Sequence, residues 1–347
     1  MTTYRIVLLP GDGVGPEVTV SAKSALEAVG AKFGLAFDFA EHAIGGAAID
    51  ATGEPLPPET QAACMASHAV FLGAVGGPKW DGAPKRPEQG LLAIRKAMGL
   101  FANLRPVKVD ASTADRSPLK REAVEGADLL IVRELTGGLY FGERTRTADR
   151  ATDQCVYTVA EVERVARVAF EAARGRRGKL ASIDKANVME TSRLWRETVV
   201  RIAADYPDVT LEHGLVDSAA MRLITHPKSY DVILTENMFG DILSDEASVL
   251  CGSIGLLGSA SLGAPGAPGL FEPIHGSAPD IAGQDRANPV GSLRATAMLL
   301  RDGLKLAEAA DALATAIDAA LAGGAATADL SGTFGTQAMT TAVVERL

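Results

Sequence analysis

Residues 5–29 read RIVLLPGDGVGPEVTVSAKSALEAV. The apolar run Arg5–Leu9 is typical of a buried strand, and Pro10-Gly11 predicts a turn directly after it. Pro16 suits the first turn of a helix, and apolar residues recur at helical spacing from Glu17 to Val29. The order of strand, glycine-rich turn and helix predicts the start of an α/β fold.

The turn Gly11–Pro16 differs from the Rossmann dinucleotide fingerprint. The GxGxxG pattern needs its third glycine where this chain has Pro16. No clear acidic residue closes a second strand about 20 residues later. We interpret the segment as a tight structural turn, and we expect any dinucleotide cofactor to bind elsewhere.

The alternation of strand and helix continues along the chain. Short apolar runs predict buried strands over 69–72, 129–132, 180–183 and 232–235. Helical spacing predicts helices over 91–98, 159–174, 192–204, from about 240, and across 293–321. Residues 144–158 lack periodicity and predict a mobile loop or an arm that orders against a partner. The Gly/Pro-rich stretch 258–269 predicts a loop or a crossing between domains.

Composition limits the classes of function. The 347 residues favour about two domains, and the net charge of -9 disfavours nucleic acid and membranes as partners. Cys64, Cys155 and Cys251 are far apart, which favours unpaired thiols in a reducing compartment. Met1–Leu9 lacks the plan of a signal peptide, and no apolar run approaches the roughly 20 residues of a membrane span. We expect a cytoplasmic protein.

Charged residues suggest an anionic substrate and a metal ion. Arg95, Arg105 and Arg133 could clamp carboxylates with their guanidinium forks, or simply form surface salt bridges. Asp241 and Asp245 are four apart, so a helix places them on one face, where a hard cation would relieve their repulsion. Asp217 could add a third oxygen. A solvated helix face is the alternative.

Three further candidates could act on a substrate or cofactor. Lys185 follows a predicted strand and could act as a base if a cleft lowered its pKa, although an exposed lysine is the commoner case. Tyr140 lies among glycines that would let a ligand approach. The segment His275–Gly283 offers backbone N–H groups, and its Asp280 could bind ribose hydroxyls.

Taken together, these segments resemble one family nearly end to end. The likeness rests on LLPGDGVGPEV, FLGAVGGPKWD, GLLAIRK, LFANLRPVKV, IVRELTGGLYFGE, SIDKANVME, NMFGDILSDEAS and FEPIHGSAPDIAG, in the expected order. The chain resembles the β-decarboxylating dehydrogenases, the family of isocitrate and isopropylmalate dehydrogenases.

The resemblance implies a fold of two α/β domains around a deep cleft, without a Rossmann fold. Residues 1–100 and 254–347 would form the first, cofactor-binding domain, and 101–253 the second. The family is dimeric and its active sites are shared between subunits, which would make 144–158 an intersubunit arm.

The resemblance also implies the roles of site residues. Arg95, Arg105 and Arg133 would hold the malate carboxylates. Asp217, Asp241 and Asp245 would bind Mg2+ or Mn2+, with Asp217 and Lys185 supplied by the neighbouring subunit. Lys185, assisted by Asp217, would accept the hydroxyl proton, and Tyr140 would protonate the enol. The NAD-binding residues would be His275, Gly276, Ser277, Ala278, Pro279, Asp280, Ile281, Asn288 and Asn187.

Two leucines indicate the substrate. Related isocitrate and homoisocitrate enzymes carry polar Ser and Asn in the segment where this chain has Leu91 and Leu92. An apolar pocket suits an isopropyl group and disfavours a third carboxylate. We expect an NAD-dependent decarboxylating dehydrogenase of 3-isopropylmalate. The alternatives are another 3-alkylmalate, tartrate or homoisocitrate as substrate, or a non-catalytic regulatory paralogue.

Overall fold

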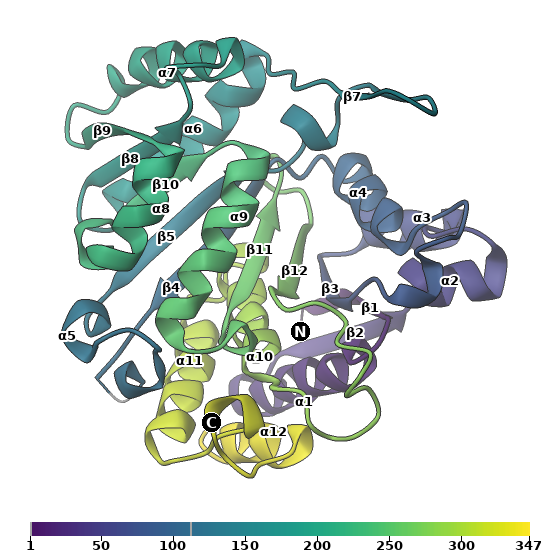
Figure 1. Cartoon of the computed structure of the whole chain (residues 1–347). Coiled ribbons are helices and arrows are strands. Elements are labelled where there is room, and N and C mark those ends of the chain that lie inside the picture. The colour runs from purple at the N-terminus through teal and green to yellow at the C-terminus, as the bar shows by residue number, and fades with distance from the viewer. Residues whose placement is uncertain (1, 112) are drawn as a thin grey trace. The chain divides into compact units, whose positions relative to one another are not determined.

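The computed structural model describes residues 2–111 and 113–347, so Met1 of the segment Met1–Leu9 lies outside the described residues, as does Ser112. The chain divides into two compact units (Figure 1). Unit 1 combines Met1–Leu100 with Ser253–Leu347, and unit 2 is Phe101–Gly252. Unit 1 therefore contains both ends of the chain, whereas unit 2 is continuous.

Unit 1 has a five-stranded arrangement in the order β2-β1-β3-β12-β11. Its strands are β1 (Thr3–Gly11), β2 (Ala36–Glu41), β3 (Ala69–Ala74), β11 (Gly258–Leu262) and β12 (Gly269–Pro273). All neighbours pair in parallel except β11 and β12, which are antiparallel. The run Ile6–Leu9 in β1 is almost completely buried, as the apolar sequence predicts.

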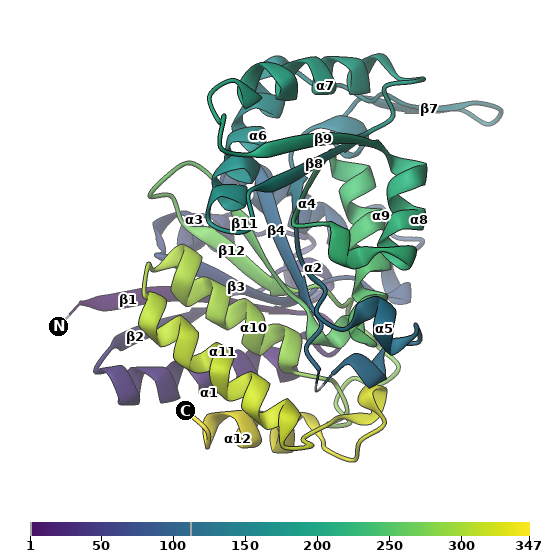
Figure 2. The ribbon, with the colours of Figure 1, turned by 90° about the vertical axis from the view of Figure 1, so that its left-hand side faces the viewer.

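Helices cover both faces of these strands. They are α1 (Gly15–Phe33), α2 (Gly45–Thr52), α3 (Pro58–Ala66), α4 (Pro87–Ala97), α10 (Val290–Met298), α11 (Ala307–Ala322) and α12 (Thr336–Val344). In Figure 2, α10 and α11 lie in front of the strands and α2 to α4 lie behind them. The short helices α2 and α3 were not predicted from the sequence.

Strand β11 corrects the interpretation of 258–269 as a loop or crossing over residues 258–262, whereas residues 263–268 do form a loop. Its sequence GSASL has four small residues and little β-propensity, so no periodic signal marks it. The small residues are required by packing, because a Cβ on Gly258 would come within 2.4 Å of the backbone nitrogen of Ala295 in α10. Close approach of the helix, not intrinsic propensity, determines this strand.

Unit 2 has its own five strands in the order β4-β5-β10-β8-β9. They are β4 (Ala102–Lys108), β5 (Asp128–Glu134), β8 (Lys179–Asp184), β9 (Thr210–Leu215) and β10 (Val232–Thr235). Only β4 runs antiparallel to its neighbour. The prediction of largely parallel, buried strands therefore describes both units, although β2, β4 and β9 were not identified individually.

The helices of unit 2 lie on both faces of its strands, with α6 and α7 on one face and α8 and α9 on the other (Figure 2). They are α5 (Arg121–Val124), α6 (Val159–Arg174), α7 (Glu190–Ala203), α8 (Val216–Thr225) and α9 (Asn237–Ser248). Helix α6 has the predicted bounds because Thr158 and Glu161 form a capping box at its start. Helix α9 begins three residues before the predicted start, and α8 was not predicted.

The segment 144–158 contains two short strands that the sequence does not predict. Strands β6 (Arg144–Arg146) and β7 (Ala151–Asp153) form an antiparallel hairpin. Its side chains are largely exposed, and Figure 1 shows it extending away from the rest of unit 2. Among the described residues of the whole chain, no helix combines the length and apolarity that crossing a bilayer requires.

Candidate active site

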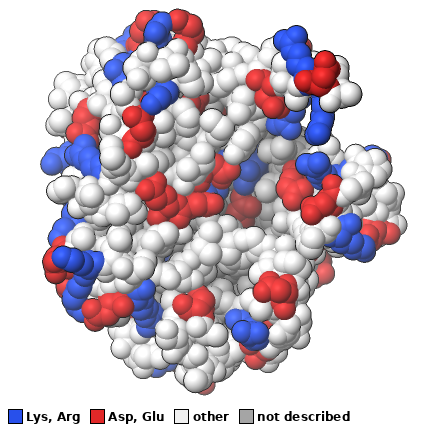
Figure 3. Space-filling model, viewed as in Figure 1, with Lys and Arg blue, Asp and Glu red and all other residues white. Residues whose placement is uncertain are grey.

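Helix α9 carries two of the three predicted metal-binding aspartates, all of which lie in unit 2. Asp241 and Asp245 are one helical turn apart, and both contact the Arg105 guanidinium, at 3.8 Å and 3.5 Å. Asp241 also forms a salt bridge with Arg133 and accepts a 3.0 Å hydrogen bond from the Tyr140 hydroxyl. Figure 3 shows acidic side chains gathered near the middle of the viewed face, where α9 lies. The structure thus groups five predicted site residues from four elements.

The strand register explains why the two arginines meet. Arg133 in β5 pairs with Asn103 in the antiparallel strand β4, and Arg105 follows two residues later. Because alternate residues of a strand share a face, both arginines point toward α9. Arg105 donates to Asn103 at 2.8 Å, and Arg133 donates to Asn237 at 3.1 and 2.8 Å. These amides fix both guanidinium planes, although neither amide was predicted as a site residue.

Charge and burial set the protonation of this cluster. Burial raises the pKa of Asp241, but the charges of Arg133 and Arg105 outweigh it, so its pKa lies below the usual value. Burial raises the pKa of Asp245, and this effect exceeds the opposing charges of Arg105 and Arg133. Burial and the Asp241 carboxylate raise the pKa of Tyr140. The cluster therefore combines an ionised carboxylate with a protonated phenol that can donate a proton.

Lys185 and Asp217 form a second pair in unit 2. Lys185 directly follows β8, and its ammonium forms a salt bridge with Asp217 in the first turn of α8. The hydrogen bond from Lys185 lowers the pKa of Asp217. Among the described residues, no three His, Cys, Asp or Glu side chains are placed to hold a metal ion together. Asp217 therefore does not join Asp241 and Asp245 within one chain.

Three neighbouring strands of unit 2 end in buried carboxylates. Glu134 ends β5, Asp184 ends β8, and Glu236 follows β10, which lies between them. Glu134 accepts backbone N–H groups and Asp184 accepts two hydrogen bonds from Arg196. The Oε1 atom of Glu236 is buried without a hydrogen-bond partner among the described residues. Burial, followed by the charges of Asp184 and Glu134, raises the pKa of Glu236 to about 7.

This buried acid predicts a pH-dependent stability. The pKa of Glu236 rises from 4.5 to about 7, so between these values the folded state binds more protons than the unfolded state. Stability is therefore lost as pH rises through 7, by about 3 kcal/mol for this group. We expect Glu236→Gln to stabilise the protein more at pH 8.5 than at pH 5, as measured by urea unfolding. The exposed Glu197→Gln is the control, and an equal effect of Glu236→Gln at both pH values would refute the assignment.

The remaining substrate residues lie in α4 of unit 1. Leu91 and Leu92 are partly exposed on this helix, whereas Arg95 is only 6% exposed. The Arg95 guanidinium donates to the buried carboxylate of Glu272 in β12 at 2.7 Å. Glu272 was not predicted as a partner of Arg95, because the two residues lie 177 positions apart in the sequence and meet only in the folded chain.

Five predicted cofactor residues line a single pocket in unit 1. The pocket has a volume of about 480 Å3 and includes His275, Gly276, Ala278, Ile281 and Asn288. It combines apolar walls with amide and carboxylate groups, as pockets for small organic ligands do. The Nε2 atom of His275 is buried without a hydrogen-bond partner among the described residues. The size and lining of the pocket therefore fit the adenosine part of a dinucleotide, and the Nε2 atom of His275 could form a hydrogen bond with it.

The other predicted cofactor residues lie outside this lining. Ser277 is buried and its carbonyl accepts the Val14 backbone N–H at 2.8 Å, so it joins the glycine turn to the pocket loop. Pro279 and Asp280 are exposed beside the pocket residues, and Asn187 is exposed in unit 2 after β8.

The glycine turn makes tight structural contacts, but its Val14 also lines the pocket of the predicted cofactor residues, which we expected to lie away from this turn. The Asp12 carboxylate accepts backbone N–H groups from Gly46, Ala47 and Gly76 at 2.7 to 2.9 Å. A Cβ on Gly13 would come within 1.9 Å of the Ser277 carbonyl. The turn is thus held in close contact with the neighbouring loops, including the loop that lines the pocket.

Comparison with known proteins identifies the family. The isocitrate/isopropylmalate dehydrogenase family model matches residues 5–347. The chain is 55% identical to 3-isopropylmalate dehydrogenase from Synechococcus sp. (strain CC9605), covering 100% of this chain and 99% of that protein. It is 54% identical to 3-isopropylmalate dehydrogenase from Geobacillus kaustophilus, covering 100% and 95%.

Solved structures agree with the sequence relatives. The crystal structure of isocitrate dehydrogenase from Methylococcus capsulatus superposes with a TM-score of 0.89 at 34% identity, covering 99% of both chains. A β-decarboxylating dehydrogenase from Thermococcus kodakarensis gives a TM-score of 0.79 at 35% identity, covering 99% of this chain and 96% of that one. This chain therefore belongs to the isocitrate/isopropylmalate dehydrogenase family.

Proposed function

We propose that the chain catalyses the NAD-dependent oxidative decarboxylation of (2R,3S)-3-isopropylmalate to 4-methyl-2-oxopentanoate and CO2, a step of leucine biosynthesis. The observation that carries this proposal is identity of 54–55%, over the full chain, to relatives named 3-isopropylmalate dehydrogenase. The enzyme is accordingly an oxidoreductase of amino-acid biosynthesis.

The substrate side of the proposal rests on α4. Leu91 and Leu92 are partly exposed and offer apolar surface to the isopropyl group. A third carboxylate, as in isocitrate, would lose its water there without gaining a partner, which costs several kcal/mol. Pockets of this kind separate alkyl lengths poorly, by about 1–3 kcal/mol per methylene. Discrimination against isocitrate should therefore exceed discrimination among 3-alkylmalates.

The acidic residues of α9 fit a divalent cation. Asp241 and Asp245 present carboxylate oxygens from one helix face, and the low pKa of Asp241 keeps that ligand charged. Oxygen ligands of this kind suit Mg2+ or Mn2+. We propose that Asp217 of a neighbouring subunit completes the set, because within one chain it does not join them.

The exposed apolar side chains support a homodimer. Met221 in α8 is 64% exposed and Ile242 in α9 is 58% exposed, on two helices that contact each other. Pairing these helices with a second copy would bury both side chains, and the β6–β7 hairpin would reach the partner. Lys185 and Asp217 would then serve the partner's site. We also propose a cytoplasmic location, on the sequence argument from the three cysteines.

The NAD pocket is assigned to unit 1, which we propose as the cofactor-binding domain. His275, Ile281 and Asn288 would hold the adenosine, and the exposed Asp280 would accept ribose hydroxyls. A carboxylate at this position repels a 2′-phosphate, so NADP should be a poor substitute.

The reaction follows from these groups. When bound, the cation would acidify the C2 hydroxyl and stabilise negative charge, and NAD would accept the hydride. Arg95, Arg105 and Arg133 hold the carboxylates in place. Lys185, in its neutral amine form and assisted by Asp217, takes the hydroxyl proton as hydride leaves C2. The carboxylate on C3 leaves as CO2, and the electrons of the broken bond form the enol. Tyr140, which its raised pKa keeps protonated, then donates its proton to C3.

The decisive assay is NADH formation by the purified protein with NAD and Mg2+. We expect 3-isopropylmalate to exceed isocitrate, homoisocitrate, tartrate and malate by a hundredfold or more in kcat/KM, with a chelator abolishing turnover and NADP giving little. If another diacid leads, the assignment to Leu91 and Leu92 is wrong. If NAD binds but no diacid reacts, a regulatory paralogue is the better interpretation.

A further inference from the structure

The loop that lines the NAD pocket, residues 275–288, has a strained backbone. Ala278 and Asp285, which both carry a Cβ, have φ values of 37° and 54°. The left-handed region is unfavourable for residues with a Cβ, and strain of this kind persists only where surrounding contacts impose it. Contacts from outside the loop must therefore hold its shape.

These contacts come from three directions. On one side, Val14 and Val18 pack against Ala278, Ile281 and Ala282. At the far end, Asp285 accepts the backbone N–H groups of Thr336 and Gln337, at 3.2 and 2.9 Å, at the start of α12.

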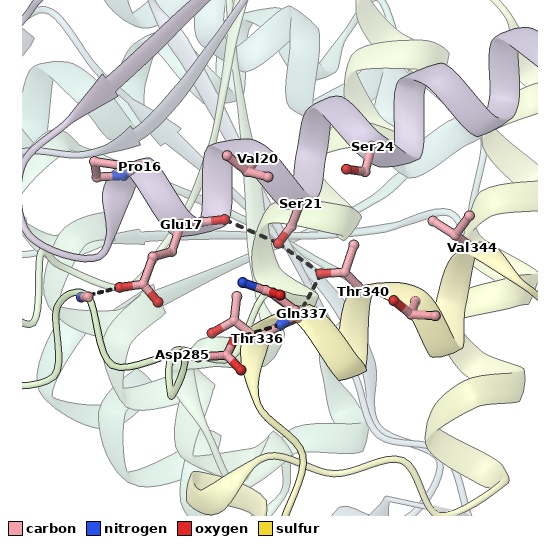
Figure 4. A pocket seen from close by; sticks show the side chains of 12 residues that line it. Pro16, Glu17, Val20, Ser21, Ser24, Asp285, Thr336, Gln337, Thr340 and Val344 are labelled. Carbon is pink, nitrogen blue, oxygen red and sulfur yellow. Dashed lines mark hydrogen bonds between the residues drawn. The ribbon is translucent and has the colours of Figure 1, made fainter.

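The third contact is a single side chain of α1. The Glu17 carboxylate accepts the backbone N–H of Gly283 at the turn of the loop (Figure 4). The second carboxylate oxygen of Glu17 is buried without a hydrogen-bond partner among the described residues. The hydrogen bond from Gly283 therefore offsets part of the cost of removing this carboxylate from water.

On one side the loop borders an open groove. A groove of about 740 Å3 lies between α1 and α12 and is lined by Glu17, Gly283, Asp285 and Gln337, among others. Ser21 and Thr340 join the two helices by a 2.8 Å hydrogen bond along the groove (Figure 4). Next to such an open groove, the position of Gly283 depends on polar contacts.

We propose that Glu17 is a positioning residue that sets the NAD affinity by holding the loop 275–288 in its binding shape. The proposal rests on the proposed NAD-binding function of that loop. Glu17 touches neither substrate nor the reacting atoms, so its loss should weaken NAD binding and leave the chemical step unchanged.

The test compares Glu17→Ala with Glu17→Gln, which keeps an acceptor oxygen, and with Glu27→Ala. Glu27 is a more distant glutamate of α1, with a side chain 57% exposed. Two readouts apply to the full-length protein: hydrogen–deuterium exchange of the 278–285 segment and NAD binding by calorimetry. For Glu17→Ala we expect faster exchange there and a Kd for NAD about tenfold higher, since a hydrogen bond to a charged group is lost. The KM for NAD should rise while kcat and the KM for 3-isopropylmalate stay unchanged, with Glu17→Gln close to wild type.

Two outcomes would overturn the role of Glu17. Unchanged exchange in Glu17→Ala would show that packing alone holds the loop. Faster exchange with an unchanged Kd would show that the contact is structural only. Failure of the wild-type protein to bind NAD is a different result, because it contradicts the proposed function itself.

Discussion

Lys185→Met should lower kcat by about a thousandfold, because a general base in hydride-transfer chemistry contributes 10²–10⁴ in rate. Methionine is unbranched and only one atom shorter than lysine, but it cannot accept the hydroxyl proton. Lys185 is partly exposed and its ammonium contacts Asp217, so the loss should be chemical and not a failure to fold. Steady-state kinetics with 3-isopropylmalate, NAD and Mg2+ measures the effect.

The control is Lys179→Met, which removes an exposed lysine from β8, the strand that Lys185 follows. It should keep near-normal turnover. In Lys185→Ala, added methylamine should restore part of the activity, since it can supply the missing base. Near-normal kcat in Lys185→Met would mean that another group takes the proton.

Asp241→Asn should raise the Kd for Mn2+ by at least about a hundredfold and lower kcat/KM by about a thousandfold. Asparagine can still accept from Arg133 through its amide oxygen, and its amide NH2 can donate to the Tyr140 hydroxyl, so both contacts of the carboxylate have a substitute. The substitution removes the negative charge of Asp241, a carboxylate that Arg133 and Arg105 keep ionised. Titration of Mn2+ by electron paramagnetic resonance, alongside kinetics, measures both effects.

Glu246→Gln on the same helix is the matched control, because it removes an acid of α9 that is not one of the predicted metal ligands. Its Mn2+ affinity should stay near the wild-type value. If Asp241→Asn binds Mn2+ within twofold of wild type, the metal site lies elsewhere.

Much of the fold could be predicted because strong local signals coincide with elements. The apolar runs at 69–72 and 232–235 lie in strands β3 and β10, and the amphipathic stretch 159–174 forms helix α6. The missed elements lack such signals. Strand β11 consists mostly of small residues selected by contact with α10, and the hairpin β6–β7 is exposed on its strands, so no apolar face marks it.

For the candidate site, the sequence predicted the ionisable residues that the structure brings together, but not the side chains that orient them. Arg105, Arg133, Tyr140, Asp241 and Asp245 are brought together, as the family resemblance implies. Asn237 and Glu272 were missed because one is an ordinary amide in a helix and the other pairs with Arg95 across a long stretch of chain. Sequence spacing carries no information about such contacts.

The discontinuity of unit 1 has a consequence for synthesis on the ribosome. All residues of unit 2 have been synthesised once Gly252 has emerged. In unit 1, strand β3 cannot pair with β12, and helix α1 cannot contact α12, until the C-terminal residues have been made. At translation rates of about 5–20 residues per second, the last part of the chain, Ser253–Leu347, takes roughly 5–20 s. During that interval the apolar strands β1 and β3 are nascent chain without a finished core. They are the segments on which a chaperone would act, although they are made first.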